Sequence, residues 1–215
     1  MGLLGRRGHG AGYCRRIDAP ASHRRPAHRP SRRNDIVDGA MGLFATLPVE
    51  EVTVQDIATA VGMTPAAVYY HFASKEQILV EGMQRFAGEL VEQVRSRIAA
   101  FEGTVDVATL VSDIISWTAR HKVPAMVYFV NSIGLNLLVE ALRRETRHEL
   151  IDVLRSAVRA GRRNRAEAGV VAVGIVSLIE TALASMLNQD STYSGLGGRH
   201  FAREVGALAG RIAGA

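Results

Sequence analysis

The sequence predicts an all-α protein, with a three-helix front module that contains a helix-turn-helix and a longer helical domain behind it. Three observations carry this prediction. Alanine, leucine, valine and isoleucine dominate a chain of 215 residues that is 47% hydrophobic. Apolar residues recur at intervals of three and four, whereas strand-like alternation is hard to find. Cap residues stand before several of these periodic segments.

Positive charge is concentrated at the N-terminus of the chain. Residues 1–33 hold nine arginines and a single acid, Asp18, whereas acids slightly outnumber lysines and arginines in residues 34–215. Because residues 1–30 also lack an apolar period, we expect them to form a disordered basic tail. Two alternatives stay open for this segment: a transit peptide, or a stretch that is not translated. The one cysteine, Cys14, excludes an internal disulfide and fits a cytoplasmic protein.

Residues 31–78 are expected to form the front module, which starts with two short helices. The second of these has Thr53 as its N-cap, and Asp56 supplies an acid at its third position. Gly62 ends it, because glycine readily adopts the left-handed conformation of a helix C-cap. The first helix begins near Asn34, is expected to end at Pro48, and has its apolar residues at helical spacing: Ile36, Val37, Ala40, Leu43 and Phe44.

A third helix, "PAAVYYH", follows almost at once. Thr64 is its predicted N-cap, and Pro65 occupies the first helical position, where a missing N–H costs nothing. Two short helices across a turn that contains glycine make a helix-turn-helix. Ala67 and Val68 are expected to pack on the preceding helix. A core helix has no use for Tyr-Tyr-His in a row, so these residues indicate a helix that meets a nucleic acid.

Further helices account for residues 79–215. Ser74 is the predicted cap of a fourth helix, with Gln77 completing a capping box, and its apolar residues run to Ile98. Apolar stripes predict additional helices at residues 107–118, from Pro124, at 139–161, at 169–187 and at 200–213.

The segment Gly169–Leu187 is the most apolar of the chain and is about long enough to span a bilayer. Glu180 lies past its middle, and a carboxylate is costly at that depth in a membrane. We therefore expect a buried helix rather than a membrane span. A helix that is apolar all round must be covered on two sides, here by its own core and by a second subunit.

Residues 33–79 closely resemble the DNA-binding module of the TetR family of bacterial transcriptional regulators. The resemblance rests on "RRNDIVDGAMGLF" and "VTVQDIATAVGMTPAAVYYHFASKEQIL". It includes a Thr before the first motif helix, Asp-Ile-Ala within it, a Gly-hydrophobic-Thr turn, Tyr-x-His-Phe and Ser-Lys-Glu. One departure is Ala66-Ala67, where many relatives carry Gly-Thr or Gly-Ser.

The predicted DNA contacts combine hydrogen-bonding or charged groups for phosphates with apolar edges for thymine methyls. The hydrogen-bonding and charged members are Thr53, Thr64, Tyr69, His71, Lys75, Arg32 and Arg33. The apolar members are Pro65, Ala66, Ala67 and Tyr70. Phe72 is instead expected in the core, and the same could hold for Tyr69.

The resemblance further implies a cytoplasmic homodimer that regulates transcription, most simply a repressor that a small, largely apolar ligand releases from a palindromic operator. Dimer contacts are expected from residues 169–187 and 200–213. Polar-tipped side chains in apolar surroundings suit a ligand pocket: Trp117, His121, Tyr128 and Asn131. The alternative for each is an ordinary core or surface residue.

An enzyme is not expected, and neither is a cofactor or a metal ion. The chain has no Gly-rich phosphate loop, no His-Glu-x-x-His and no nucleophile elbow. A second alternative is a ligand-binding or sequestration protein that no longer binds a specific operator.

Overall fold

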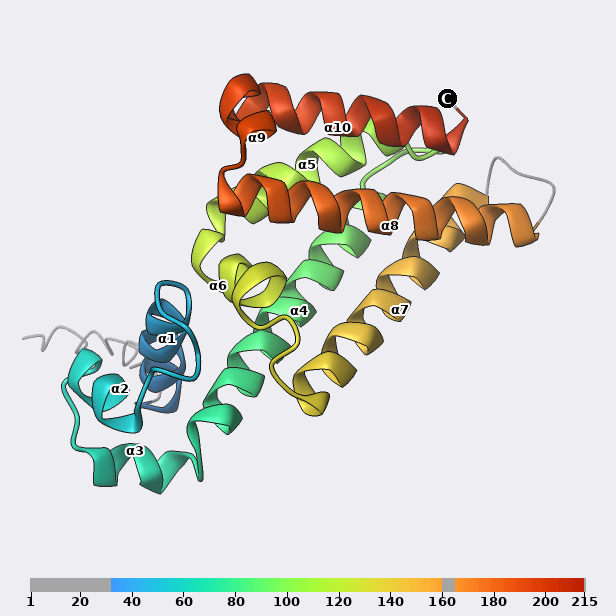
Figure 1. The fold of residues 1–215 in the computed structure, drawn as a ribbon. Coiled ribbons are helices and arrows are strands. Elements are labelled where there is room, and N and C mark those ends of the chain that lie inside the picture. The colour runs from blue at the N-terminus through green and yellow to red at the C-terminus, as the bar shows by residue number, and fades with distance from the viewer. Residues whose placement is uncertain (1–31, 160–164, 215) are drawn as a thin grey trace, which may run out of the picture. The chain divides into compact units, whose positions relative to one another are not determined.

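The computed structural model describes residues 32–159 and 165–214, and every regular element among them is a helix. Figure 1 shows their arrangement. The helices are α1 (Arg32–Phe44), α2 (Val54–Ala60), α3 (Pro65–His71), α4 (Lys75–Ala99), α5 (Val107–Arg120), α6 (Lys122–Met126), the π-helix η1 (Val127–Asn131), α7 (Leu137–Arg159), α8 (Arg165–Asn188), α9 (Ser191–Leu196) and α10 (Gly198–Ala213). The predicted all-α fold is confirmed, and the predicted basic tail, residues 1–30, lies outside the described residues.

The helix-turn-helix forms where the cap residues predicted it. Thr53 and Asp56 make a reciprocal capping box at the start of α2. Gly62 has a φ of +64°, the left-handed conformation that glycine adopts without strain. Thr64 then caps α3 by accepting a hydrogen bond from the Ala67 N–H at 3.2 Å. The bounds of α3 are those expected from the sequence.

Three local details differ from the prediction. Helix α1 ends at Phe44, before Pro48, so the proline does not terminate it. The Gln77 side chain accepts from the Ala73 N–H at 2.8 Å rather than from Ser74. Helix α6 starts at Lys122, which places Pro124 in its first turn, where a missing N–H is still tolerated.

Helix α4 joins the front helices to the rear ones (Figure 1). It packs on α1 at one end and on α5 and α7 further along. Met83 and Phe86, both 1% exposed or less, are buried at its centre. Residues Ser31–Ala215 form one compact unit, and α4 crosses the boundary predicted at residue 78 without a break.

Helices α8 and α10 lie side by side in the rear part, and α10 packs closely on α5 (Figure 1). By length and composition, Ala166–Asn188 could cross a membrane, but half of that segment is buried within the chain. Glu180, within this segment, forms an ion pair with Arg147 of α7. On one side, α8 therefore serves as a core helix.

Two elements were not predicted: the π-helix η1 and the short α9. A π-turn has no simple apolar period, and such turns often occur at functional sites. The packing face of α10 also differs from the predicted stripe. Small residues, among them Gly206 and Gly210, are buried against α5, whereas Leu208 is 40% exposed.

The close approach of α10 to α5 predicts that Gly206→Ala destabilises the fold. A Cβ at Gly206 would overlap the Ala108 carbonyl oxygen and lie 3.2 Å from the Ser112 Cβ. We expect the free energy of unfolding in urea to fall by about 1–3 kcal/mol. Gly88→Ala is the matched control, because Gly88 is an exposed glycine of α4 with open space around it. The control should gain about 0.5–1 kcal/mol; equal values for both variants would contradict the packing described here.

Candidate nucleic-acid interface and effector cavity

Helix α3 is anchored to the protein by few residues and presents the others to solvent. Val68 is 1% exposed, and Phe72 at the helix C-cap is also 1% exposed, as expected for core residues. Tyr69 is 56% exposed and Tyr70 is 85% exposed. Adjacent exposed apolar side chains form a patch, and exposed apolar patches often mark interaction sites. The outer surface of α3 is therefore a candidate contact surface.

The remaining predicted residues of α3 surround the two tyrosines. Thr64 and Ala66 are exposed, whereas Pro65 and Ala67 are half-buried. The His71 ring is half-buried and meets the Tyr70 ring edge-on, with 5.1 Å between the ring centroids. We call the exposed residues Thr64, Ala66, Tyr69 and Tyr70 the α3 face.

Lys75 has a different role from the predicted phosphate contact. Its ammonium donates hydrogen bonds to the carbonyl oxygens of Val49, Glu50 and Val52, at 2.8, 2.9 and 2.8 Å. An ammonium has three N–H donors, so all three are used inside the protein. Lys75 therefore fixes the loop between α1 and α2 to the start of α4, behind the α3 face.

Arg33 is also held within the protein rather than free for phosphate. Its guanidinium donates to the Glu81 carboxylate, with Nε at 3.0 and 3.1 Å from the two oxygens, and to the His71 carbonyl at 2.5 Å. Its Cζ lies 3.9 Å from the centroid of the Phe72 ring. These contacts tie α1 to the end of α3 and to α4. Arg32 differs: its side chain is 61% exposed, and its ion-pair contact among the described residues is with Asp35, at 3.9 Å.

Thr53 is exposed, but its hydroxyl is committed to the capping box. Its Oγ1 donates to the Asp56 carboxylate at 2.6 Å and accepts from the Asp56 N–H at 3.2 Å. The hydrogen bonds from the Thr53 side chain and backbone lower the pKa of Asp56. The ionised form of Asp56 is thus favoured by these hydrogen bonds, and it holds the start of α2 in place.

Two of the predicted ligand residues lie together: Trp117, which is buried, and His121, which is half-buried. The Trp117 and His121 rings stack with 4.0 Å between centroids, and the His121 Nδ1 lies 2.9 Å from the Trp117 carbonyl. They line a wide, open depression beside Glu89 and Glu92 of α4. The other face of Trp117 stacks on Phe86, so the indole also belongs to the core.

Tyr128 and Asn131 do not join them. Tyr128 is 5% exposed and packs on Phe86, and burial raises the pKa of its phenol. The Asn131 amide donates to the Phe44 carbonyl at 2.8 Å, at the last residue of α1. Asn131 thus links η1 to α1 through this hydrogen bond.

A small apolar cavity lies elsewhere, between α4, α5, α7, α8 and η1. It leaves about 20 Å³ for a water-sized molecule, and its lining residues are Leu90, Val94, Ile114, Phe129, Leu150, Leu154, Val176, Ile179 and Glu180. Sequence reasoning missed this set because it searched for polar-tipped residues, whereas eight of these nine side chains are apolar. Their only sequence signal was the core periodicity of five separate elements.

Comparison with known proteins identifies the front module. The family described as "Bacterial regulatory proteins, tetR family" matches residues 36–81. The HTH-type transcriptional repressor KstR2 of Rhodococcus jostii is 35% identical over 72 residues, which are 34% of this chain and 35% of that protein. The KstR2 protein of Mycolicibacterium smegmatis is 27% identical over 143 residues, or 63% of this chain and 69% of the relative. The alignment with the Rhodococcus protein thus spans about a third of that relative's length.

The rear helices are matched by solved structures. The transcriptional regulator FadR of Bacillus subtilis, in complex with stearoyl-CoA, superposes with a TM-score of 0.67 at 19% identity. The superposition covers 84% of this chain and 95% of FadR, which shows a shared fold over both parts. Residues 36–81 of the chain thus match the model of the TetR family of bacterial regulatory proteins.

Proposed function

We propose that the protein is a cytoplasmic homodimeric transcriptional repressor that a small ligand releases from its operator. The observation that carries this proposal is the α3 face, with Tyr70 85% exposed on a helix that is capped and anchored from behind. A helix-turn-helix of this kind places its second helix in the major groove. The repressor name of the KstR2 relatives supports the same direction of control.

On DNA, we propose that the α3 face reads base edges while cations outside α3 neutralise phosphates. Tyr70 and Ala66 present apolar groups that suit thymine methyls, and Thr64 and Tyr69 present hydroxyls. Arg32, at the start of α1, is a largely exposed cation of the front module. The arginines of residues 1–30 are the proposed source of further phosphate contacts, since Lys75 and Arg33 are already paired.

Two copies of α3 must be spaced by one turn of DNA, ~34–36 Å, to enter successive major grooves. We propose that α8 and α10 hold the two subunits together. Val170 and Val173 of α8 are 73% and 43% exposed, and Leu208 of α10 is 40% exposed. A second subunit that covers these side chains would remove their apolar surface from water.

For release, we propose that the ligand enters the small apolar cavity and moves η1. Phe129 of η1 lines this cavity, and Asn131 of the same helical turn holds the Phe44 carbonyl of α1. A ligand that pushes Phe129 outward therefore strains the link to the front module. Binding shifts the population from DNA only by the difference in ligand affinity between the two states.

A DNA-binding experiment tests the proposed function. The full chain is titrated into labelled DNA from upstream of its own gene and into random DNA of equal length. A repressor of this kind binds the upstream fragment ~10³-fold or more tightly than random DNA at physiological salt. Equal affinity for both fragments would favour the alternative of a ligand-binding or sequestration protein.

A further inference from the structure

A charged cleft adjoins the apolar cavity. The cleft is about 420 Å³ in size and lies between η1, α7 and α8. Its lining includes three arginines of α7: Arg143, Arg144 and Arg147. Phe129 and Glu180 line both the cleft and the cavity. An apolar space and a cationic space therefore meet at these two side chains.

The ion pair between Arg147 and Glu180 lies at this junction. Their side chains are 32% and 35% exposed, and Arg147 also donates to the Ser177 hydroxyl at 2.9 Å. A carboxylate on the edge of an otherwise apolar cavity is costly without a partner. Arg147 supplies that partner and holds Glu180 at the mouth of the cavity.

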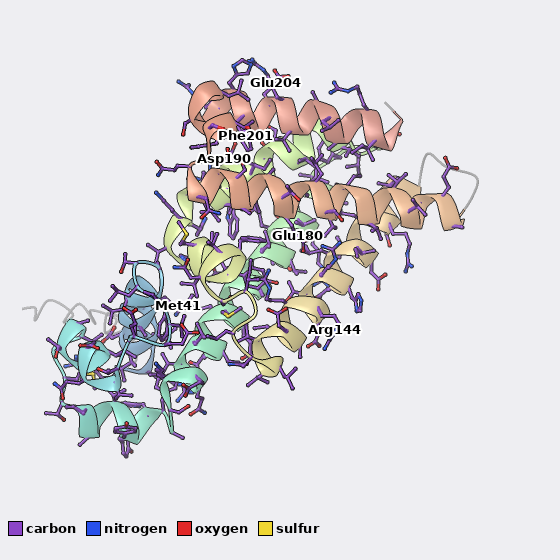
Figure 2. The ribbon with its side chains drawn as sticks, in the orientation of Figure 1. Met41, Arg144, Glu180, Asp190, Phe201 and Glu204 are labelled. Carbon is purple, nitrogen blue, oxygen red and sulfur yellow. The ribbon has the colours of Figure 1, made fainter. Side chains whose placement is uncertain are left out.

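The cleft has more positive charge than its own acids neutralise. Its three arginines face two glutamates, Glu140 and Glu180. Arg143 donates to the Tyr128 carbonyl and lies 3.8 Å from Glu140. Arg144 is exposed and, among the described residues, has neither a hydrogen-bond nor an ion-pair partner. Figure 2 shows Glu180 on α8 and Arg144 on α7.

We propose that the effector is an amphipathic anion, with a hydrocarbon chain in the apolar cavity and a carboxylate or phosphate group in the arginine cleft. Arg144 binds the anionic group, and Arg147 exchanges Glu180 for it. This inference rests on the proposed function, because it assigns the chemical class of the releasing ligand. Arginine suits both head groups, since its planar donors match carboxylate and phosphate oxygens.

The small size of the apolar cavity makes entry of the ligand's hydrocarbon chain dependent on the ion pair. With about 20 Å³ free, the cavity must widen before it admits an alkyl chain. The two side chains at the junction, Phe129 and Glu180, are the ones that must move. An anion that competes for Arg147 frees Glu180, whereas a neutral ligand leaves the ion pair in place. Binding of the anionic head group therefore opens the apolar cavity to the ligand's hydrocarbon chain.

The test is direct binding to the full chain without DNA. The probes are dodecanoate, dodecanoyl-coenzyme A, 1-dodecanol and coenzyme A alone, each below its micelle concentration. Calorimetry gives the Kd, and the fluorescence of the single tryptophan, Trp117, gives a second readout because its ring stacks on the buried Phe86. If dodecanoate binds tightly, the head group of the effector is a carboxylate. If dodecanoyl-coenzyme A binds tightly and dodecanoate does not, the head group is a phosphate.

Two variants should change anion binding in opposite directions. Arg144→Gln should raise the Kd of the anion about three- to fivefold, as for a partly exposed charge pair. The Kd of 1-dodecanol should stay within about twofold of the wild-type value. Glu180→Gln should lower the Kd of the anion relative to that of 1-dodecanol, because Glu180 no longer competes with the anion for Arg147. Arg155→Gln is the matched control on α7, since Arg155 pairs with Asp152 outside the cleft, and it should change neither Kd.

Several results would overturn the proposal. They are equal affinity for 1-dodecanol and both anions, no binding of any probe, anion affinity that is unchanged in Arg144→Gln, or coenzyme A binding as tightly as its thioester. These measurements contain no DNA, so their failure is separate from failure of the proposed function. Specific binding of the upstream DNA without anion binding would keep the repressor and reject this effector class.

Discussion

Leu208→Arg is expected to convert the proposed dimer into monomers that bind operator DNA about 100-fold more weakly or worse. Leu208 lies on α10 with 40% of its surface exposed, so arginine is tolerated there in a single subunit. In the dimer, a guanidinium would be placed in an apolar contact without a partner. Loss of the second half-site removes the gain from linked binding, which is typically 10²–10⁴-fold. Light scattering and DNA titration measure the two effects.

The matched control is Leu138→Arg. Leu138 is 61% exposed on α7, outside the proposed interface, so this variant should keep both its mass and its DNA affinity. If Leu208→Arg keeps the dimer mass, the interface lies elsewhere. Leu183, also within the segment predicted to dimerise, is 0% exposed in the core of one subunit. Leu183→Arg should therefore unfold the chain, at a cost of more than ~4 kcal/mol, and does not test the interface.

Lys75→Met is expected to lower the free energy of unfolding by about 2–3 kcal/mol, because it leaves carbonyls without their charged donor. The carbonyls of Val49 and Val52 are the partly buried ones. Methionine keeps the length of the side chain but donates no hydrogen bond. Urea unfolding of wild type and variant measures the loss.

Lys122→Met is the control for this substitution, since Lys122 is an exposed lysine of α6; its stability should stay within about 0.5 kcal/mol of wild type. A phosphate contact predicts the reverse pattern for Lys75→Met. In that case stability would be unchanged, and the slope of log K against log salt would become shallower by about 0.9. That pattern would restore the original expectation for Lys75.

The elements that the sequence predicted well are those that depend on neighbours in the chain. The bounds of α3 follow from Thr64 and Pro65, and the end of α2 from Gly62, because capping involves residues at most a few positions apart. Phe72 was expected in the core, and it is 1% exposed. The exposure of Tyr69 and Tyr70 agrees with a helix that has one narrow buried stripe.

The errors concern contacts between distant segments. Lys75 meets a carbonyl 26 residues earlier in the chain, and Asn131 meets one 87 residues earlier. Both residues have polar ends that suit a ligand equally well, so their types did not distinguish the two roles. The apolar cavity was missed for a related reason: its lining comes from five elements, and periodicity assigns each residue only to a core.

The most direct test of the account is the DNA affinity of Tyr70→Ala, measured with upstream and random DNA alongside the melting temperature. Tyr70 is 85% exposed, so its removal should leave the melting temperature within about 1 °C, since such surface changes cost less than ~0.5 kcal/mol. Affinity for the upstream DNA should fall about tenfold, equal to ~1.4 kcal/mol, and affinity for random DNA should change much less. Leu137→Ala is the control, because Leu137 is 89% exposed on α7 and should change neither value. An unchanged affinity for the upstream DNA, or a large fall in melting temperature, would contradict the claim that the α3 face reads DNA.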